Sequence, residues 1–217
     1  MPRSEIEILN ELIARYPVLA PCKKSIQTAY EMLRDSYEDG KKLLVCGNGG
    51  SAADSEHIVG ELMKGFKSLR PLDKQEKQKL EYIHPEMGAL LSSRLQSPLP
   101  AISLVGHPGL TTAFSNDVDN GGKIAFAQQA YGLGNAGDVL LGITTSGNSE
   151  NVLLAAVAAK AKGLFVLGLT GQGGGKLAEL ADVIIAVPEK ETFKVQELHL
   201  PIYHCLCLML ERHFYGE

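Results

Sequence analysis

The chain of 217 residues is 45% hydrophobic and 21% charged, as is typical of a folded domain in water, and its formal net charge of −4 argues against a nucleic-acid surface held by bulk electrostatics. No apolar run approaches the roughly 20 residues that span a bilayer, and the charged start lacks the apolar core of a signal peptide. The cysteines form no CxxC pair, so we expect reduced, buried thiols. These observations predict one cytoplasmic domain over residues 1–217, without nucleic-acid or membrane partners.

Two helical patterns open the chain, at residues 4–16 and 23–39, and predict an N-terminal helical hairpin. Five short runs rich in Val, Ile and Leu follow, at residues 42–46, 101–105, 138–143, 164–169 and 182–187. Helical patterns lie between the last four runs, most clearly at 149–162. This alternation predicts an α/β fold, a three-layer sandwich around a doubly wound, five-stranded parallel sheet.

Two further segments complete the pattern. Residues 67–98 are polar and charged, and they separate the first two predicted strands by more than an ordinary crossover. We expect this insertion to add a helix on the rim of the fold, with partial disorder as the alternative. The last segment, 192–215, reads as one long helix in which Pro201 could cause a kink.

The turn after the first predicted strand contains three glycines, at positions 47, 49 and 50, and leads into a helix. Glycines let the backbone bend tightly, and a helix N-terminus offers unpaired N–H donors at the positive end of its dipole. This combination predicts a seat for an anion, most often phosphate. His57 and Glu61 follow on that helix and, four residues apart, share one face. We therefore expect chemistry on a phosphorylated small molecule.

Two other nucleotide-binding motifs are excluded by neighbouring residues. The glycine spacing of the first turn also fits the dinucleotide fingerprint, but the next strand pattern ends without the acidic residue that holds a ribose. The run at 173–176 hints at a P-loop, but Thr170 and Leu177 replace its first glycine and its hydroxyl residue.

The loop at 144–149, Thr-Thr-Ser-Gly-Asn-Ser, precedes another predicted helix. Ser149 alone would cap that helix, so the other hydroxyl and amide residues exceed what capping requires. Hydroxyls and N-terminal amides can hold a phosphate without a cation.

The C-terminal helix carries polar residues on an otherwise apolar pattern, among them Gln196 and His204. Taken singly, each such residue has an ordinary explanation as a satisfied buried or surface side chain. Together with His57 and Glu61 they could bind a divalent metal or act as acid and base. Gln196 and His204 are eight residues apart, about 12 Å along a helix, so one ion would need inward-folding side chains or ligands from different subunits.

These motifs coincide in a known family: the chain resembles the sugar isomerase (SIS) domain proteins and, within them, the phosphoheptose isomerases. The matching segments run in the family's order over most of the chain after residue 40, and they are CGNGGSAADSEHIVGE (46–61), SNDVDN (115–120), GDVLLGITTSGNSENV (137–152), LTGQGGGKLAELAD (169–182) and VQELHLPIYH (195–204). The resemblance implies a single SIS domain, an isomerase that interconverts sedoheptulose 7-phosphate and D-glycero-D-manno-heptose 7-phosphate, and a homotetramer with active sites between subunits. It also implies one zinc ion per subunit and oligomerisation through residues 1–39.

Site residues carried over by position are implied by the same resemblance. Glu61 and His204 match the catalytic base and acid. The zinc ligands match His57, Glu61, Gln196 and His204. The substrate contacts match Asn48, Gly49, Gly50, Ser51, Glu61, Asn116, Asp117, Thr144, Thr145, Ser146, Ser149, Thr192 and Gln196.

The chain departs from the family in its longer insertion at 67–98, which could reshape the pocket entrance or subunit contacts, and in Thr144, where the family usually has serine. Two alternatives stay open: an isomerase of another phosphosugar, and a non-catalytic sugar-phosphate-binding regulatory or assembly protein. Non-enzymatic relatives would be expected to lack Glu61 and His204, so their presence favours an enzyme.

Overall fold

The fold is known from a computed structural model, which describes residues 4–216. Its centre is a five-stranded sheet in the order β2-β1-β3-β4-β5, in which every pair of neighbours is parallel. The strands are β1 (Leu43–Gly47), β2 (Ala101–Ser103), β3 (Val139–Thr144), β4 (Phe165–Thr170) and β5 (Val183–Ala186). The predicted doubly wound parallel sheet is confirmed.

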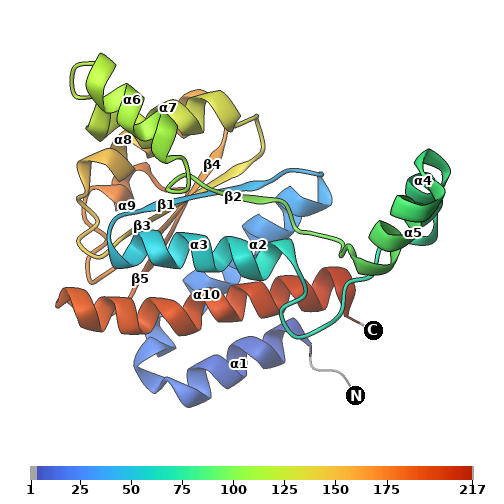
Figure 1. Cartoon of the computed structure of the whole chain (residues 1–217). Coiled ribbons are helices and arrows are strands. Elements are labelled where there is room, and N and C mark those ends of the chain that lie inside the picture. Colours follow the sequence, from blue (N-terminus) through green and yellow to red (C-terminus); the bar gives the residue numbers. More distant parts are fainter. Residues whose placement is uncertain (1–3, 217) are drawn as a thin grey trace.

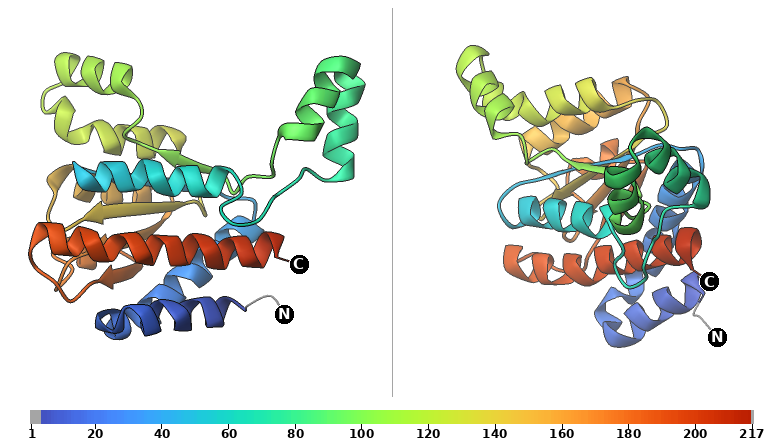
Figure 2. Two further views of the ribbon diagram at one scale, coloured as in Figure 1. Left: turned by 60° about the horizontal axis from the view of Figure 1, so that its bottom comes forward. Right: turned by 45° about the vertical axis from the view of Figure 1, so that its right-hand side comes forward.

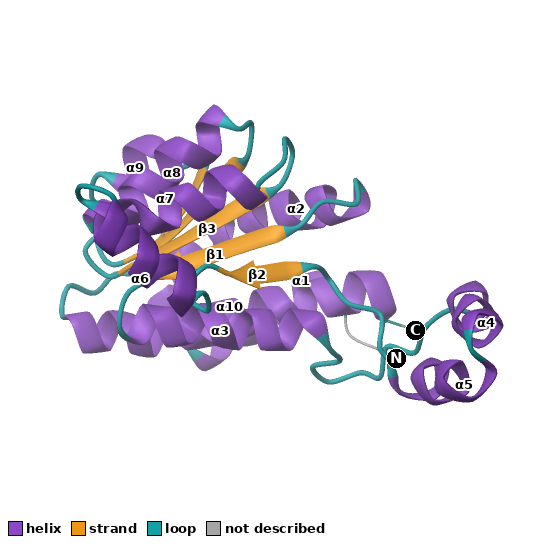
Figure 3. Cartoon of the chain, turned by 45° about the horizontal axis from the view of Figure 1, so that its top comes forward, coloured by secondary structure: helices purple, strands orange, loops and turns teal. Residues whose placement is uncertain are grey.

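Helices cover both faces of this sheet and make three layers (Figure 1). One face carries α2 (Lys23–Glu38), α3 (Gly50–Met63) and α10 (Thr192–Tyr215), with α1 (Glu5–Arg15) packed outside α10. The other face carries α7 (Gly121–Leu133), α8 (Glu150–Ala161) and α9 (Leu177–Leu180), with α6 (Pro108–Asp117) beyond α7. Figure 3 shows the strands enclosed between these helices.

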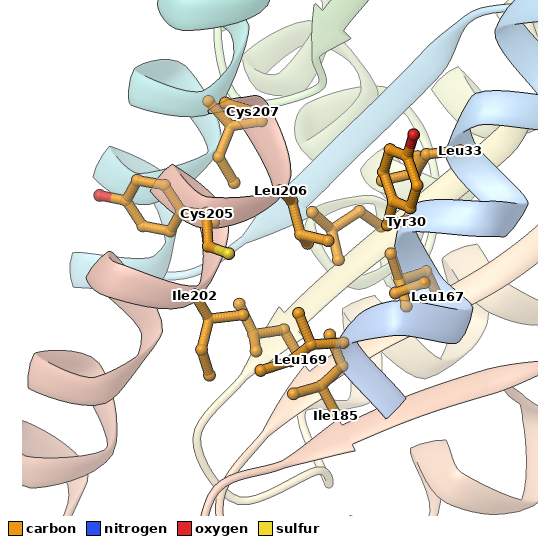
Figure 4. Packing of buried hydrophobic residues seen from close by; sticks show 14 of the residues in the cluster. Tyr30, Leu33, Leu167, Leu169, Ile185, Ile202, Cys205, Leu206 and Cys207 are labelled. Carbon is orange, nitrogen blue, oxygen red and sulfur yellow. The ribbon is translucent and has the colours of Figure 1, made fainter. Parts of the chain in front are cut away.

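The alternation of side chains along β1 divides the core in two. Leu43 and Val45 belong to a large cluster with α2, α3 and α10, whereas Leu44 and Cys46 pack with α8 on the opposite face. Figure 4 shows the large cluster where Ile202 of α10 meets Leu169 of the sheet. Because a strand buried on both faces needs apolar residues at every position, the sequence shows continuous rather than alternating hydrophobic runs.

The N-terminal helices contribute to this core, which changes the interpretation of residues 1–39. A short 3-10 helix, η1 (Pro17–Cys22), joins α1 to α2. In α2, Ile26 and Leu33 are fully or almost fully buried, and Leu9 of α1 has no exposed surface. The two helices are present as predicted, but α1 packs mainly against α10 rather than forming an isolated hairpin with α2. Removing residues 1–39 would therefore open the core, and an oligomeric role for them stays a prediction.

The insertion forms two helices instead of the single one expected. These are α4 (Lys74–Ile83) and α5 (Pro85–Arg94), which pack against each other and project away from the sandwich as an arm (Figure 2). A Cβ at Gly88 would lie 2.1 Å from the Leu80 carbonyl oxygen, so only glycine allows the two helices to come this close. Pro71 and Gln96 pair across the base of the arm.

A buried ion pair fixes the start of the insertion to the body. Arg70 donates to Glu211 of α10 at 2.9 Å and to the Leu62 carbonyl at 2.8 Å, and neither charged side chain is more than 4% exposed. Glu211 also accepts the backbone N–H groups of Phe66, Lys67 and Ser68. The carboxylate thus supplies hydrogen-bond acceptors for the backbone N–H groups of a turn that forms no regular secondary structure.

The predictions of one long C-terminal helix and of buried, unpaired cysteines agree with the structure. The last helix runs continuously through Pro201. All four cysteines are buried and unpaired, and burial raises the pKa of the Cys46, Cys205 and Cys207 thiols to about 12. Within residues 4–216, no helix is both long and apolar enough to cross a bilayer, the 24-residue α10 included.

Candidate active site

Three loops rich in small and hydroxyl residues meet at one edge of the sheet. They follow β1, β3 and β4, which are neighbours, so their carboxyl ends lie side by side. Asn48 after β1 exchanges two side-chain hydrogen bonds with Asn151 of α8, at 2.9 and 2.8 Å. The Gly171 N–H after β4 donates to the Thr145 carbonyl at 3.0 Å. The three loops therefore converge at the edge of the sheet where parallel sheets bind ligands.

The loop after β3 presents hydroxyls at the N-terminus of α8. The Thr144 and Ser149 hydroxyls are 2.8 Å apart, and Ser146 Oγ accepts the Asn148 N–H at 3.1 Å while its side chain stays exposed. Ser149 is the N-cap residue of α8, but its hydroxyl bonds Thr144 rather than the helix backbone. Helix capping therefore does not account for these hydroxyls. They remain available to bind an anion.

Glycine is required where the loops after β3 and β4 touch. Gly147 has φ +68°, and a Cβ there would lie 2.0 Å from the Gly174 carbonyl oxygen. The Lys176 N–H donates to Asn148 Oδ1 at 3.1 Å, which brings an exposed lysine to the edge of the same loop. The sequence predicted a phosphate seat without a cation, whereas the fold places the backbone of Lys176 against this loop.

The His57 and Glu61 pair meets His204 where α3 and α10 lie side by side. His57 Nε2 is 3.2 Å from Glu61 Oε1 and 3.4 Å from His204 Nε2. The Glu61 side chain is 14% exposed, and its other oxygen, Oε2, is 3.3 Å from Lys64 Nζ. Burial, and to a smaller extent His57, lowers the pKa of His204, with Glu61 acting in the opposite direction. His204 is therefore neutral near pH 7 and can both accept and donate a proton.

Tyr203 and Asp54, which the sequence did not single out, complete this cluster. The Tyr203 hydroxyl lies 3.0 Å from His57 Nδ1 and 3.3 Å from Asp54 Oδ1. In the sequence, Asp54 is three positions before His57 on α3, and Tyr203 directly precedes His204. Neither spacing indicates a shared site unless α3 and α10 are known to be neighbours.

Gln196 is placed at the opposite end of α3 from Glu61. A Cβ at Gly50 would lie 2.6 Å from Gln196 Nε2, so the amide packs on the first turn of α3. Ser51 beside it is buried, and Thr192 is the exposed first residue of α10. Glu61 is eleven residues beyond Gly50, about 16 Å along the helix axis. Within one chain, the Gln196 end and the His204 end are thus two separate groups.

Asn116 and Asp117 are not joined to the three loops by any hydrogen bond between described residues. They lie exposed at the end of α6, and the Asn116 amide donates to the Asp117 carboxylate at 2.9 Å. Helix α6 packs on α7, on the far side of the sheet from α10. Their predicted contact with substrate stays a prediction.

The predicted metal ligands are only partly grouped. Among residues 4–216, no three His, Cys, Asp or Glu side chains are arranged as a ready metal-binding group. His57, Glu61 and His204 nevertheless supply the mixed nitrogen and oxygen donors that suit zinc. Their separations of 3.2 and 3.4 Å match the roughly 3.4 Å between two ligands of a tetrahedral ion with bonds of about 2.1 Å. The donor set of these three residues fits zinc, whereas Gln196 of the same chain lies too far away.

Comparisons of this chain with a family model, with related sequences and with solved structures all point to one family. The family model described as "SIS domain" matches residues 16–171. A phosphoheptose isomerase of Helicobacter pylori is 39% identical over 214 residues, 95% of each chain, and one of Clostridium acetobutylicum is 35% identical over 98% of this chain and 95% of its own. The solved phosphoheptose isomerase of Neisseria gonorrhoeae is 31% identical, with a TM-score of 0.70 over 95% of this chain and 92% of that one. That of Francisella tularensis is 33% identical, with a TM-score of 0.69 over 96% and 92%.

Proposed function

This chain belongs to the SIS domain family and, within it, to the phosphoheptose isomerases, and we propose on that basis that it interconverts sedoheptulose 7-phosphate and D-glycero-D-manno-heptose 7-phosphate. It is an aldose–ketose isomerase, and relatives of that name match almost the full length of both chains. The observation in its own structure that carries the proposal is the contact of Glu61, His57 and His204 across α3 and α10. A carboxylate beside two imidazoles is suited to moving protons between carbon and oxygen.

In the proposed reaction, Glu61 removes the proton alpha to the carbonyl and returns it to the neighbouring carbon through an enediol. Its two oxygens face different partners, Oε1 toward His57 and Oε2 toward Lys64, so one oxygen can accept the proton while the other is held. His204, kept neutral by its lowered pKa, transfers a proton between the two substrate oxygens. The Lys64 ammonium, 3.3 Å from Glu61 Oε2, would stabilise negative charge that develops beside this carboxylate.

The substrate phosphate is assigned to the edge of the sheet formed by the three loops. Asn48, Gly49 and Gly50 lie at the start of α3, and the hydroxyls of the loop after β3 stand at the start of α8. Two helix N-termini and several hydroxyls favour an anion there. The substrate residues in this group are Asn48, Gly49, Gly50, Ser51, Thr144, Thr145, Ser146, Ser149, Thr192 and Gln196.

We assign one zinc ion per subunit to His57, Glu61 and His204, with Gln196 as the fourth ligand supplied by another copy. When bound, the ion would polarise the substrate carbonyl and favour the charge of the enediol. The separations of His57 Nε2 from Glu61 and from His204 match those between ligands of a tetrahedral ion, which supports this assignment.

We further propose a cytoplasmic homotetramer with active sites shared between subunits. Within one chain the phosphate seat and Glu61 are separated by most of the length of α3, about 16 Å. A second copy could bring its phosphate loops and Gln196 to the His57 and His204 end. The four buried, unpaired thiols are consistent with a reducing compartment.

Glu61→Gln tests the isomerase, with Glu56→Gln as the matched control because Glu56 is exposed on the same helix and lies outside the cluster. We expect Glu61→Gln to bind sedoheptulose 7-phosphate but to lose about 10²–10⁴-fold in turnover, the usual worth of a general base. The control should keep wild-type turnover. Solvent deuterium should enter the substrate carbon with the wild type and not with Glu61→Gln. A wild type that binds the phosphosugar without exchange or turnover would instead support a binding protein, and turnover confined to shorter ketose phosphates would support another isomerase.

A further inference from the structure

Tyr203 bridges two residues of α3 from the neighbouring helix α10. Its hydroxyl lies 3.3 Å from Asp54 Oδ1 and 3.0 Å from His57 Nδ1, and its ring contacts the His57 ring edge-on with centroids 5.4 Å apart. The Tyr203 side chain is only 2% exposed, so the hydroxyl is held in place by packing. The three groups form a chain that ends at the imidazole of the proposed site.

The order of hydrogen bonds in this chain follows from the donors available. An ionised carboxylate accepts only, and the second oxygen of Asp54 is buried without a partner, so Asp54 needs the Tyr203 proton. A hydroxyl has one proton, and once it is given to Asp54 the oxygen can only accept from His57. His57 must then carry its proton on Nδ1, which leaves a lone pair on Nε2.

That lone pair faces two further groups. His57 Nε2 is 3.2 Å from a Glu61 oxygen and 3.4 Å from His204 Nε2. An unprotonated nitrogen has no proton to donate to the neighbouring carboxylate, and a cation that contacts both would stabilise the pair. Histidines that bind metal usually donate their other N–H to a carboxylate or another polar group that fixes the tautomer.

We propose that Asp54 and Tyr203 are positioning residues that fix His57 as the Nδ1–H tautomer, so that Nε2 is presented to a divalent cation shared with Glu61 and His204. The proposal rests on the zinc site proposed above. It assigns a role to a tyrosine that touches neither substrate nor metal. It also gives a role to Asp54, whose carboxylate lies beside the cluster with one oxygen unpaired.

The test has two stages. The first measures the His57 tautomer in the metal-free full-length protein, and the second measures the binding of zinc to the same protein. Imidazole ¹⁵N shifts at about pH 8.5, where an ordinary histidine is neutral, report which nitrogen of His57 carries the proton. The wild type should show Nδ1–H. Tyr203→Phe removes the bridging hydroxyl and should give a mixture of tautomers. Asp54→Ala frees the Tyr203 proton to bond Nδ1 and should shift His57 toward Nε2–H, a reversal that a merely structural role would not produce.

Zinc affinity, measured by competition with a chelator, supplies the second readout. Tyr203→Phe and Asp54→Ala should each weaken zinc binding by about 10–100-fold, the usual cost of losing such a supporting partner. Tyr215→Phe is the matched control, because its hydroxyl donates to the Pro98 carbonyl at 3.0 Å and not to a histidine. Wild-type His57 found as Nε2–H, or tautomers unchanged in both variants, would overturn the inference. A wild type with the Nδ1–H tautomer that binds no zinc would instead refute the zinc assignment and leave the hydrogen-bond chain established.

Discussion

Acidification is expected to destabilise this fold through His199, a residue of α10 outside the proposed chemistry. The side chain has no exposed surface, and neither ring nitrogen has a hydrogen-bond partner. Burial lowers the pKa of His199 from 6.5 to about 4; the Thr170 backbone lies close enough to oppose this slightly, though not in hydrogen-bond geometry. Folding therefore keeps the ring neutral while the unfolded chain can protonate it.

The sign and size of the effect follow from this difference in proton binding. A histidine whose pKa is lowered by folding contributes stability above its unfolded pKa of 6.5, and that contribution is lost as the pH falls toward about 4. Each pH unit in that window is worth about 1.4 kcal/mol. The free energy of unfolding should thus fall by roughly 2 kcal/mol between about pH 7 and pH 5, and by about 3 kcal/mol once the folded-state pKa is passed.

Urea unfolding at a fixed protein concentration, at both pH values, measures this loss. His199→Leu keeps an apolar group of similar size and should remove most of the difference, whereas His107→Gln, at an exposed histidine, should leave it in place. The decisive quantity is the change with pH in each variant, since Leu could alter absolute stability for packing reasons. Parallel pH dependences for wild type and His199→Leu would refute the reasoning. So would an NMR titration in which the His199 ring protonates near 6.5 in the folded protein.

Two further predictions concern the insertion. Glu211→Gln breaks the buried pair with Arg70 and should lower the free energy of unfolding by about 3–5 kcal/mol in urea, whereas a loss under about 1 kcal/mol would show that the pair does not hold the turn. Replacing residues 74–94 with a short Gly-Ser linker should change stability by no more than about 1 kcal/mol, the scale of a several-fold change in loop length, because the arm packs on itself and its base is already paired at Pro71 and Gln96. A large drop in thermal midpoint would mean that the arm supports the core.

The order of the strands along the chain and the polar residues available to the site could be predicted from the amino-acid sequence. Continuous apolar runs predicted five buried parallel strands because a strand covered on both faces has no polar side to show, and β1 with its alternating contacts meets that condition. Glycine-rich turns before helices predicted the loops of the proposed anion seat, and the close contact at Gly147 requires glycine in one of them. These features are local, since they depend on residues within a few positions of one another.

Which of those residues contact one another depends on how distant helices pack in the fold. His57 and His204 are 147 positions apart, and their contact exists because α3 and α10 lie side by side on one face of the sheet. The same packing places Gln196 against Gly50 at the start of α3 and Tyr203 against Asp54, which no pattern along the chain could indicate. The second helix of the arm and the Arg70–Glu211 anchor were likewise beyond the sequence. This ion pair joins two buried charges from distant segments of the chain. It forms because the fold buries both and lets them hydrogen-bond, which the local secondary-structure preference of the residues does not indicate.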